Sequence, residues 1–275
     1  LSNENILFPY LQNAYLPIRT ALLNPNSKVT AYEIITIKHA YATLLKLFFN
    51  LQSLRLINKS WLHQSISNAG DVELYDLILN FAPLGLSLTS PVPDPENYPK
   101  EFNRSTKTTE VYEQHKMLRH LKDNGNGYLL TGKYFSFSAK NVFKFVRGKL
   151  LKDQNIQTIF RLPGGLLSST MIESLLFHLT KNNNSEVQFV DTTECFKKIS
   201  RTELGLSQSG TIDIFDAINK GQKLEHRVEK INTQSLISKV SDIDPNRFVD
   251  NSEAAQSRRR LLANYSDYDE VYLGS

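Results

Sequence analysis

Short apolar runs rich in β-branched residues alternate along this chain with longer segments whose apolar residues recur every three or four positions. The short runs are typical of buried strands, and the longer segments are typical of helices packed on a sheet. Residues 37–51 are the clearest helical segment, with Leu44, Leu45 and Phe48 among its apolar positions. The alternation predicts an α/β fold, in which helices cover both faces of a mostly parallel sheet.

The expected strands are residues 5–8, 28–32, 54–57, 75–79, 128–130, 156–160, 175–179 and 187–190. The expected helices are residues 16–23, 37–51, 109–122, 140–151 and 212–220. Residues 181–185 have the composition of a hairpin turn, so the last two strands are expected to pair antiparallel. Because the chain becomes more polar from about residue 200, we expect a main domain over residues 1–200 and a C-terminal helical or irregular extension over residues 201–275.

Composition narrows the class of protein. Hydrophobic residues make up 40% of the chain and charged residues 22%, which is ordinary for a soluble globular protein. No apolar run reaches the roughly 18–20 residues of a bilayer span, and the first residues lack the pattern of a secretory signal. Cys195 is the only cysteine, which excludes an internal disulfide and fits a reducing compartment. We therefore expect a cytoplasmic protein with no membrane association.

The net charge and the positions of the histidines constrain the class of protein less than the composition does. Lys and Arg total 32 against 28 for Asp and Glu, a balance that permits nucleic-acid binding without requiring it. None of the 6 histidines is spaced with Cys195 or with carboxylates as metal ligands are, so no metal site is expected. The glycine pair at residues 164–165 lacks the spacing and the lysine of a phosphate-binding loop.

Basic residues are interleaved with aromatic residues in two segments, and three arginines follow one another near the end of the chain. Such interleaving is typical of surfaces that contact nucleic-acid backbone and bases, although aromatics at this spacing also build cores. The arginine run fits either a phosphate-binding patch or a solvated helix face. The candidate DNA contacts are Lys133, Lys144, Arg147, Lys149, Arg258, Arg259 and Arg260.

Four segments in the second half of the chain, residues 120–125, 159–167, 187–191 and 243–249, occur in the order of similar segments in a known family. They resemble the N-6 adenine-specific DNA methylases, in particular the modification subunits of type I restriction systems. Residues 120–125 resemble the family's "LKPGG" turn before a strand, and residues 159–167 are similar to its "VIGLPxxLF" segment. Residues 187–191 resemble its "FIDAS" strand, and residues 243–249 its "NLNPSRYV" segment. The resemblance implies a Rossmann-like S-adenosylmethionine-dependent methyltransferase sheet, mostly parallel with an antiparallel C-terminal hairpin.

The resemblance also implies where cofactor and target residues belong in the first half. The family has a glycine-rich loop resembling "DPACGSGGF" after the first strand, an acidic residue after the second, an aspartate after the third, and "NPPF" or "NPPY" after the fourth. Glycines let backbone amides approach S-adenosylmethionine, and the acidic residue accepts hydrogen bonds from ribose hydroxyls. The Asn-Pro-Pro-aromatic loop holds the flipped adenine, whose amine it aims at the methyl group.

Most of these residues are replaced in this chain. The first loop, residues 8–16, keeps Pro9 but has neither the leading aspartate nor any glycine. Glu33 stands at the place of the ribose-binding acid, and Ser60 stands where the third strand's aspartate belongs. We therefore interpret Pro9 and Glu33 as remnants of a cofactor site, and we expect bulky side chains to fill the space the cofactor needs.

The target-binding loop is altered in the same way. Aligned without a gap on "LANPPFG", residues 79–85 put Phe81 at the amine acceptor, Ala82 at the first proline, Pro83 at the second and Leu84 at the stacking aromatic. A shift of one residue would put Asn80 at the acceptor position. Losing the acceptor, the first proline and the ring removes most of the positioning that makes methyl transfer fast.

Three functions therefore remain open. The first is a catalytically degenerate methylase-like protein of a restriction-modification or related DNA-defence system, acting as a DNA-binding or complex-forming subunit, without cofactor. The second is an active N-6 adenine DNA methyltransferase that uses S-adenosylmethionine. The third is an unrelated α/β interaction module with no nucleic-acid role. The expected partners are DNA and the other subunits of such a complex.

Overall fold

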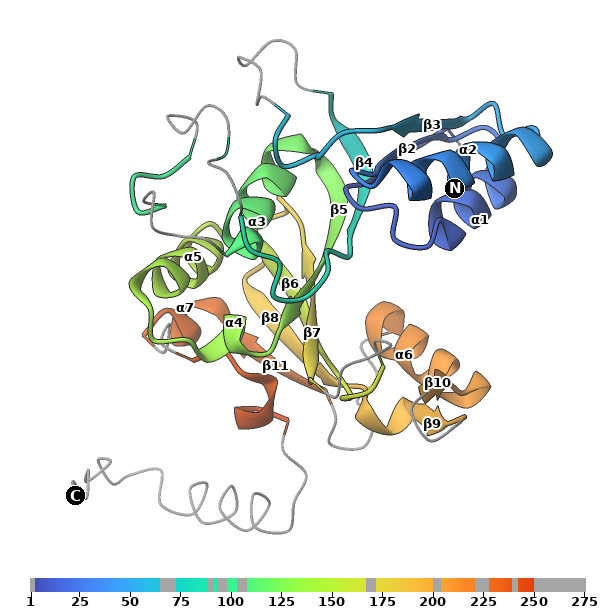
Figure 1. The fold of residues 1–275 in the computed structure, drawn as a ribbon. Coiled ribbons are helices and arrows are strands. Elements are labelled where there is room, and N and C mark those ends of the chain that lie inside the picture. Colours follow the sequence, from blue (N-terminus) through green and yellow to red (C-terminus); the bar gives the residue numbers. More distant parts are fainter. Residues whose placement is uncertain are drawn as a thin grey trace, which may run out of the picture.

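The computed structural model describes residues 3–64, 73–88, 92, 98–102, 108–166, 172–199, 204–220, 228–238 and 242–249. Within these residues, nine strands form one sheet in the order β11-β8-β6-β7-β5-β4-β1-β2-β3 (Figure 1). The strands are β1 (Asn5–Phe8), β2 (Lys28–Tyr32), β3 (Leu54–Ile57), β4 (Tyr75–Asn80), β5 (Leu121–Gly132), β6 (Ile156–Leu162), β7 (Ser174–Leu179), β8 (Glu186–Asp191) and β11 (Val228–Asn232). The helices are α1 (Tyr15–Leu23), α2 (Thr36–Phe48), α3 (Thr109–His120), α4 (Tyr134–Phe137), α5 (Asn141–Lys152), α6 (Gln208–Lys220) and α7 (Thr233–Ile237).

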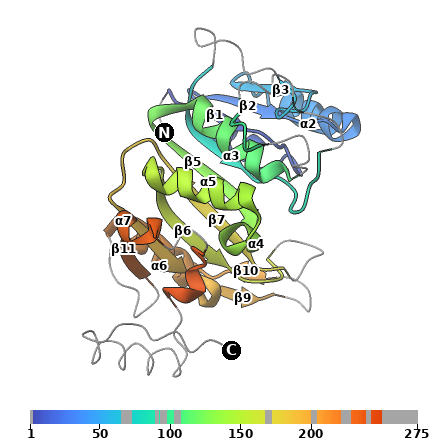
Figure 2. The same ribbon diagram turned by 90° about the vertical axis from the view of Figure 1, so that its left-hand side faces the viewer.

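Alternate residues of β1 enter two different cores. Leu7 packs in a cluster with residues of α3 and α5, whereas Ile6 and Phe8 pack in a cluster with residues of α1 and α2. Side chains of a strand point alternately to its two faces, so these pairs of helices cover opposite faces of the sheet. Figure 2 shows α3 and α5 beside each other in front of the strands. The expected α/β architecture with a mostly parallel sheet is confirmed.

The antiparallel hairpin of the sheet is formed by β6 and β7, not by β7 and β8 as the turn at residues 181–185 suggested. Strand β6 lies between β7 and β8, and it pairs antiparallel with β7 and parallel with β8. The connection from β7 to β8 crosses the start of β6, where Thr180 N–H donates to Asn155 O (2.8 Å) and Asn184 N–H donates to Gln154 O (2.9 Å). The segment joins two strands that have β6 between them, so the expected antiparallel pairing of β7 with β8 is wrong.

Strand β5 begins earlier than the sequence suggested. It follows α3 directly at Leu121, and residues 122–125 form an irregularity in its pairing with β4, between the pairs Tyr75–Leu121 and Leu77–Asn126. Gly125 is required there, because an added Cβ would lie 2.9 Å from Tyr75 O. The glycines that suggested a turn before the strand therefore allow a bulge within it.

Part of the chain after residue 200 belongs to the sheet and the core. Strand β11 pairs antiparallel with β8 along its whole length. Leu236 in α7, together with Ile243 and Val249, is buried in the same cluster as residues of α3 and α5. A small antiparallel pair, β9 (Phe196–Lys198) and β10 (Leu204–Leu206), projects beside α6. Of the helices within the described ranges, none is long and apolar enough to cross a membrane.

Candidate functional site at the carboxyl end of the sheet

The segments that the sequence singled out in the first half meet at one edge of the sheet. Because β1 pairs parallel with both β2 and β4, the carboxyl ends of these three strands lie side by side. Residues 9–16 follow β1, Glu33 follows β2, and residues 81–84 follow β4. In open α/β sheets, ligands bind at this edge, where the strand order reverses.

The loop after β1 keeps a backbone shape that glycine favours, without having glycine. Gln12 and Ala14 have φ angles of 58° and 66°, in the left-handed region. Aligned on "DPACGSGGF", these are two of the three positions at which the family loop has glycine. A left-handed residue other than glycine costs roughly 1–2 kcal/mol. The loop thus has a backbone conformation that suits glycine, but it carries side chains at these two positions.

Two hydrogen bonds tie this loop to its neighbours. Leu11 N–H donates to Tyr32 O at the end of β2 (2.8 Å). The Gln12 amide donates to Phe81 O, in the segment after β4. Leu11 and Ala14 are each 1% exposed and pack in the core between β1 and α1. The loop is therefore held against both strand ends, and two of its side chains are part of the hydrophobic core.

Tyr10 connects this loop to α3. Its hydroxyl donates to Oε1 of Glu113 at 2.6 Å. Glu113 is fully buried, and burial raises the pKa of its carboxyl group to about 7, an effect that the hydrogen bond from Tyr10 opposes. Burial also raises the pKa of the Tyr10 phenol, so the hydroxyl keeps its proton and acts as the donor. The pair links β1 to the helix that follows the β4 segment.

A second Tyr–Glu pair lies one turn earlier on α3. The Tyr134 hydroxyl, just after β5, donates to Oε1 of Glu110, which is 2% exposed. The negative charge of Glu110 adds to the effect of burial in raising the pKa of Glu113. Two carboxyl groups and two phenols therefore gather under this edge of the sheet, and each carboxyl group has one donor from another element.

Asn80 is the last residue of β4 and lies under the same edge. Its side chain is fully buried, and neither amide atom makes a hydrogen bond of ordinary geometry within the described residues. The amide lies beside Glu113 and lowers the pKa of that carboxyl group, against the effect of burial. Asn80 thus faces the Tyr10–Glu113 pair instead of solvent.

The residues after Asn80 form a turn. Leu86 N–H donates to Pro83 O at 3.3 Å, and Gly85 between them has a φ of 73°. Ala82 is 3% exposed, whereas Pro83 is exposed and Leu84 is half-buried. Residues 83–86 therefore form an ordinary turn.

Glu33 already has a partner in the chain. Its Oε1 accepts from Ile35 N–H at 2.8 Å, at the start of α2, and the residue is 9% exposed. A carboxylate at this place satisfies a backbone donor of the helix start. One of its two oxygens is therefore engaged in local structure.

The basic residues proposed for DNA contact are not together. Arg147 is fully buried in α5, where Nη1 donates to Phe135 O (2.9 Å) and Nη2 to Ser138 O (2.8 Å). Lys144 and Lys149 are exposed on the same helix, and Lys149 forms an ion pair with Asp153 at 2.7 Å. Arg258, Arg259 and Arg260 lie outside the described residues. Lys144 and Lys149 therefore present charge to solvent, as does Lys152 at the end of the same helix.

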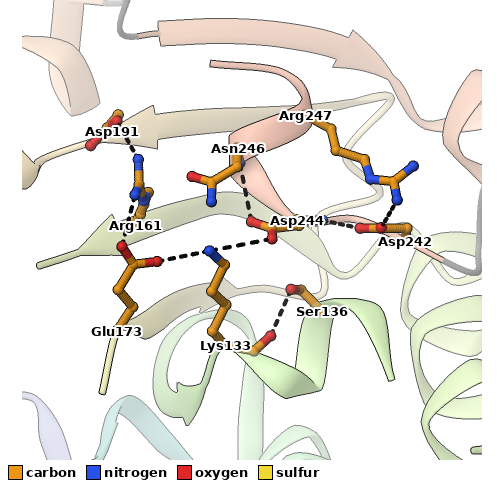
Figure 3. A network of polar contacts seen from close by, with 9 residues as sticks. All are labelled: Lys133, Ser136, Arg161, Glu173, Asp191, Asp242, Asp244, Asn246 and Arg247. Atoms are coloured by element: carbon orange, nitrogen blue, oxygen red, sulfur yellow. Dashed lines mark hydrogen bonds and ion pairs between the residues drawn. The ribbon is translucent and has the colours of Figure 1, made fainter. Parts of the chain in front are cut away.

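Lys133 belongs to a network of ion pairs (Figure 3). Its ammonium group lies 2.8 Å from Glu173 Oε2 and 3.7 Å from Asp244 Oδ2. Arg161 bridges Glu173 (2.8 Å) and Asp191 (3.1 Å). Although burial alone would raise the pKa of Glu173, hydrogen bonds from Lys133 and Arg161 hold it below the ordinary value. The network joins the ends of β5, β6 and β8 to the start of β7 and to Asp244, which follows α7 in the chain.

The sequence missed the residues that build the buried cluster. Glu110 and Glu113 read as surface acids in the first turns of a helix, where carboxylates are favoured by the helix dipole. The available sequence signal was their position on either side of the apolar residues Val111 and Tyr112. No group of three or more His, Cys, Asp or Glu side chains that could hold a metal ion occurs in the part of the chain that the structure describes.

The sheet order and the helices on its two faces define an α/β fold of the methyltransferase type. The chain belongs to the N-6 DNA methylase family, whose model matches residues 87–258. No curated protein matches it in sequence.

Several solved structures with this fold come from type I restriction-modification systems. The methyltransferase subunit from Streptococcus thermophilus superposes with a TM-score of 0.78 at 16% identity, over 90% of this chain and 55% of that one. A chain from a study of complex assembly in the type I system gives 0.70 at 17% identity, over 96% and 60%. The type I restriction enzyme EcoKI M protein gives 0.65 at 13% identity, over 97% and 69%. The chain thus spans little more than half the length of the first of these structures.

Proposed function

We propose that this chain is a methylase-like subunit of a restriction-modification or related DNA-defence complex, and that it does not transfer methyl groups. In this proposal it acts by binding DNA or the other subunits of the complex. The observation that carries the proposal is the Tyr10–Glu113 hydrogen bond, which runs between the loop after β1 and α3 at the edge where the family binds its cofactor.

The residues at this edge do not fit S-adenosylmethionine. The cofactor needs backbone amides that can be approached closely, which glycines provide. Here Leu11 N–H is bonded to Tyr32 O, and the positions of the family glycines include Gln12 and Ala14. The ribose also needs a carboxylate with free acceptors, whereas one oxygen of Glu33 accepts from Ile35 N–H. We therefore derive no methyl-transfer step for this chain.

The target-binding segment supports the same proposal. An adenine amine needs an exposed acceptor and a ring to stack on, held in place before reaction. Asn80, the acceptor that a one-residue shift would offer, is fully buried beside Glu113. Leu84 stands where the family has its aromatic ring.

The extent of the family match is also consistent with lost catalysis. The matched region begins at residue 87, after the loop following β1 and after residues 80–84. Divergence is therefore concentrated in the first third of the chain, which would bind the cofactor and the target base. The fold, by contrast, superposes on the methyltransferase subunit from Streptococcus thermophilus over 90% of this chain.

A methyl-transfer assay separates this proposal from its alternative, an active N-6 adenine DNA methyltransferase. The purified chain is incubated with radiolabelled S-adenosylmethionine and duplex DNA, next to the Asn80→Ala variant. We expect no label in adenine from either protein. Label that appears with the unaltered chain and disappears with Asn80→Ala would establish the alternative. Label that is equal in both preparations would come from a contaminating enzyme.

A second measurement tests the DNA contact within the proposal. Fluorescence anisotropy of a labelled duplex is followed at salt concentrations from 50 to 200 mM. Phosphate contacts release counterions, so the affinity should fall steeply as salt rises. No binding at low salt would remove DNA from the proposal and leave assembly with other subunits.

A further inference from the structure

Helix α2 turns its more apolar side away from the sheet. Ile37, Tyr41, Leu44 and Phe48 recur at steps of four, three and four residues, which places them on one stripe. Their exposed fractions are 75%, 56%, 66% and 80%. The side that faces the sheet is centred on Ala42, the only residue of the helix that is fully buried. A helix packed on a sheet normally has the opposite arrangement.

The neighbouring helix extends this surface. Helices α1 and α2 pack beside each other on the same face of the sheet (Figure 1). Leu22 and Leu23 at the end of α1 are 45% and 67% exposed. We call these two leucines and the four residues of the α2 stripe the α1–α2 apolar face. Contiguous exposed apolar patches of this kind mark interaction sites in soluble proteins.

Charge narrows the kind of partner that fits. The two helices carry three charged residues, Arg19, Lys38 and Lys46, and all three are basic. Two copies of the chain meeting through this face would bring like charges together, which is unfavourable in an interface. The face therefore suits a partner that is apolar or aromatic and acidic.

We propose that the α1–α2 apolar face binds the C-terminal segment of the same chain, residues 264–275. This segment lies outside the described residues, but its sequence has the complementary composition. It contains three acidic residues, five large apolar or aromatic residues and no basic residue. The acids are Asp267, Asp269 and Glu270, and the apolar or aromatic residues are Tyr265, Tyr268, Val271, Tyr272 and Leu273.

The covalent connection is long enough for this contact. Phe248 packs on Phe189 of β8, with ring centroids 4.4 Å apart, so the described chain ends near that strand. From β8 to β2 is six strand positions in the sheet, or about 30 Å. Phe248 packs on the face that α3 and α5 cover, so the connection must also pass to the outer side of α2 on the opposite face. Residues 250–263 reach roughly 45 Å when extended, so this contact requires them to be nearly extended.

Hydrogen–deuterium exchange of the full chain tests the contact. In the unaltered protein we expect the amides of residues 264–275 to exchange at least tenfold more slowly than in the Leu44→Asp variant. Ile212→Asp is the matched control, because Ile212 is also an exposed apolar residue of a helix (55%), on α6. Slow exchange should persist in this control. Equal exchange of the segment in all three proteins would overturn the proposal.

Charge reversal gives a test that does not depend on the apolar substitution. Lys38→Glu with Lys46→Glu should abolish the slow exchange, and adding Asp267→Lys and Glu270→Lys to the same chain should restore it. Failure of this restoration would contradict a direct contact. Slow exchange that increases with protein concentration would assign the segment to a neighbouring copy and overturn intramolecular binding. The inference does not rest on the proposed function, because neither result depends on methyl transfer or DNA.

Discussion

The Tyr10 hydroxyl and the Glu113 carboxyl group are joined by a hydrogen bond of 2.6 Å, beneath the edge of the sheet where β1 and β4 end. The bond connects two segments that are 103 residues apart in the chain. Because Glu113 is fully buried, its carboxyl group has no access to water as an alternative donor. The pair thus fixes the loop after β1 to α3, and several measurable properties follow from it.

Tyr10→Phe should lower the free energy of unfolding by about 1–2 kcal/mol, because a buried acceptor loses its donor. Chemical denaturation measures the change. Tyr15→Phe is the control, since Tyr15 is 55% exposed and its hydroxyl only accepts from Arg19 on the surface. We expect that control to stay within about 0.5 kcal/mol of the unaltered protein. Equal effects of the two substitutions would mean that the Tyr10 bond contributes nothing specific.

Glu113 should make stability depend on pH. Its carboxyl group has a pKa raised from 4.5 to about 7, so folding favours the protonated form. The contribution is fully present below pH 4.5 and is lost as pH rises toward 7, by at most about 3 kcal/mol. Glu113→Gln, which can still accept from Tyr10, should gain stability relative to the unaltered protein between pH 4.5 and 7.

Denaturation of both proteins at pH 4.5, 5.5 and 7 measures this difference. Burial lowers the pKa of His178 to about 4, so its contribution is lost as pH falls from about 6.5 toward 4. That loss occurs in both proteins and cancels in the comparison. A difference that does not change with pH would contradict a protonated Glu113.

Ala14→Gly should raise the free energy of unfolding by about 0.5–1 kcal/mol, because glycine adopts the φ of 66° without strain. Ala21→Gly is the matched control, since Ala21 is equally buried but lies within α1. That substitution should lower stability by about 1 kcal/mol. Destabilisation of similar size at both positions would show that the left-handed backbone at Ala14 carries no strain.

Two of the basic residues of α5, Lys144 and Arg147, should behave differently when substituted. Lys144→Glu should weaken binding to duplex DNA at low salt and leave the unfolding midpoint unchanged, because the side chain is exposed. Arg147→Met should instead destabilise the fold, because two buried carbonyls lose their donors. Anisotropy and thermal denaturation on both variants separate the roles. Weaker DNA binding by a fully folded Arg147→Met protein would contradict the structural role of this arginine.

How much of this could be predicted from sequence differs between fold and site. The strand at residues 5–8 and the helix over 37–51 were recognisable because the periodicity of apolar residues is a local property. The pairing of β7 was not, since a segment such as residues 181–185 can join two adjacent strands or two strands with another strand between them. Which of these occurs depends on β6, through Gln154 and Asn155, and this is a long-range contact.

For the site, the sequence identified the segments but not the side chains that fill them. Missing glycines in the loop after β1 are visible in the sequence, and they directed attention to residues 8–16. The partner of Tyr10 was not predictable, because Glu113 is far away in the chain and resembles a surface acid of a first helical turn. Arg147 shows the converse: a basic residue among aromatics suggests DNA contact, but here its guanidinium group binds carbonyls inside the fold.

The most direct test of the central claim is calorimetric titration of the purified chain with S-adenosylmethionine at pH 7.5. Tyr10, Leu11, Gln12 and Ala14 take the place of the family's glycine-rich loop. We therefore predict no saturable binding heat at cofactor concentrations up to 1 mM, which corresponds to a Kd weaker than about 1 mM. Saturable binding with a Kd in the micromolar range would contradict it.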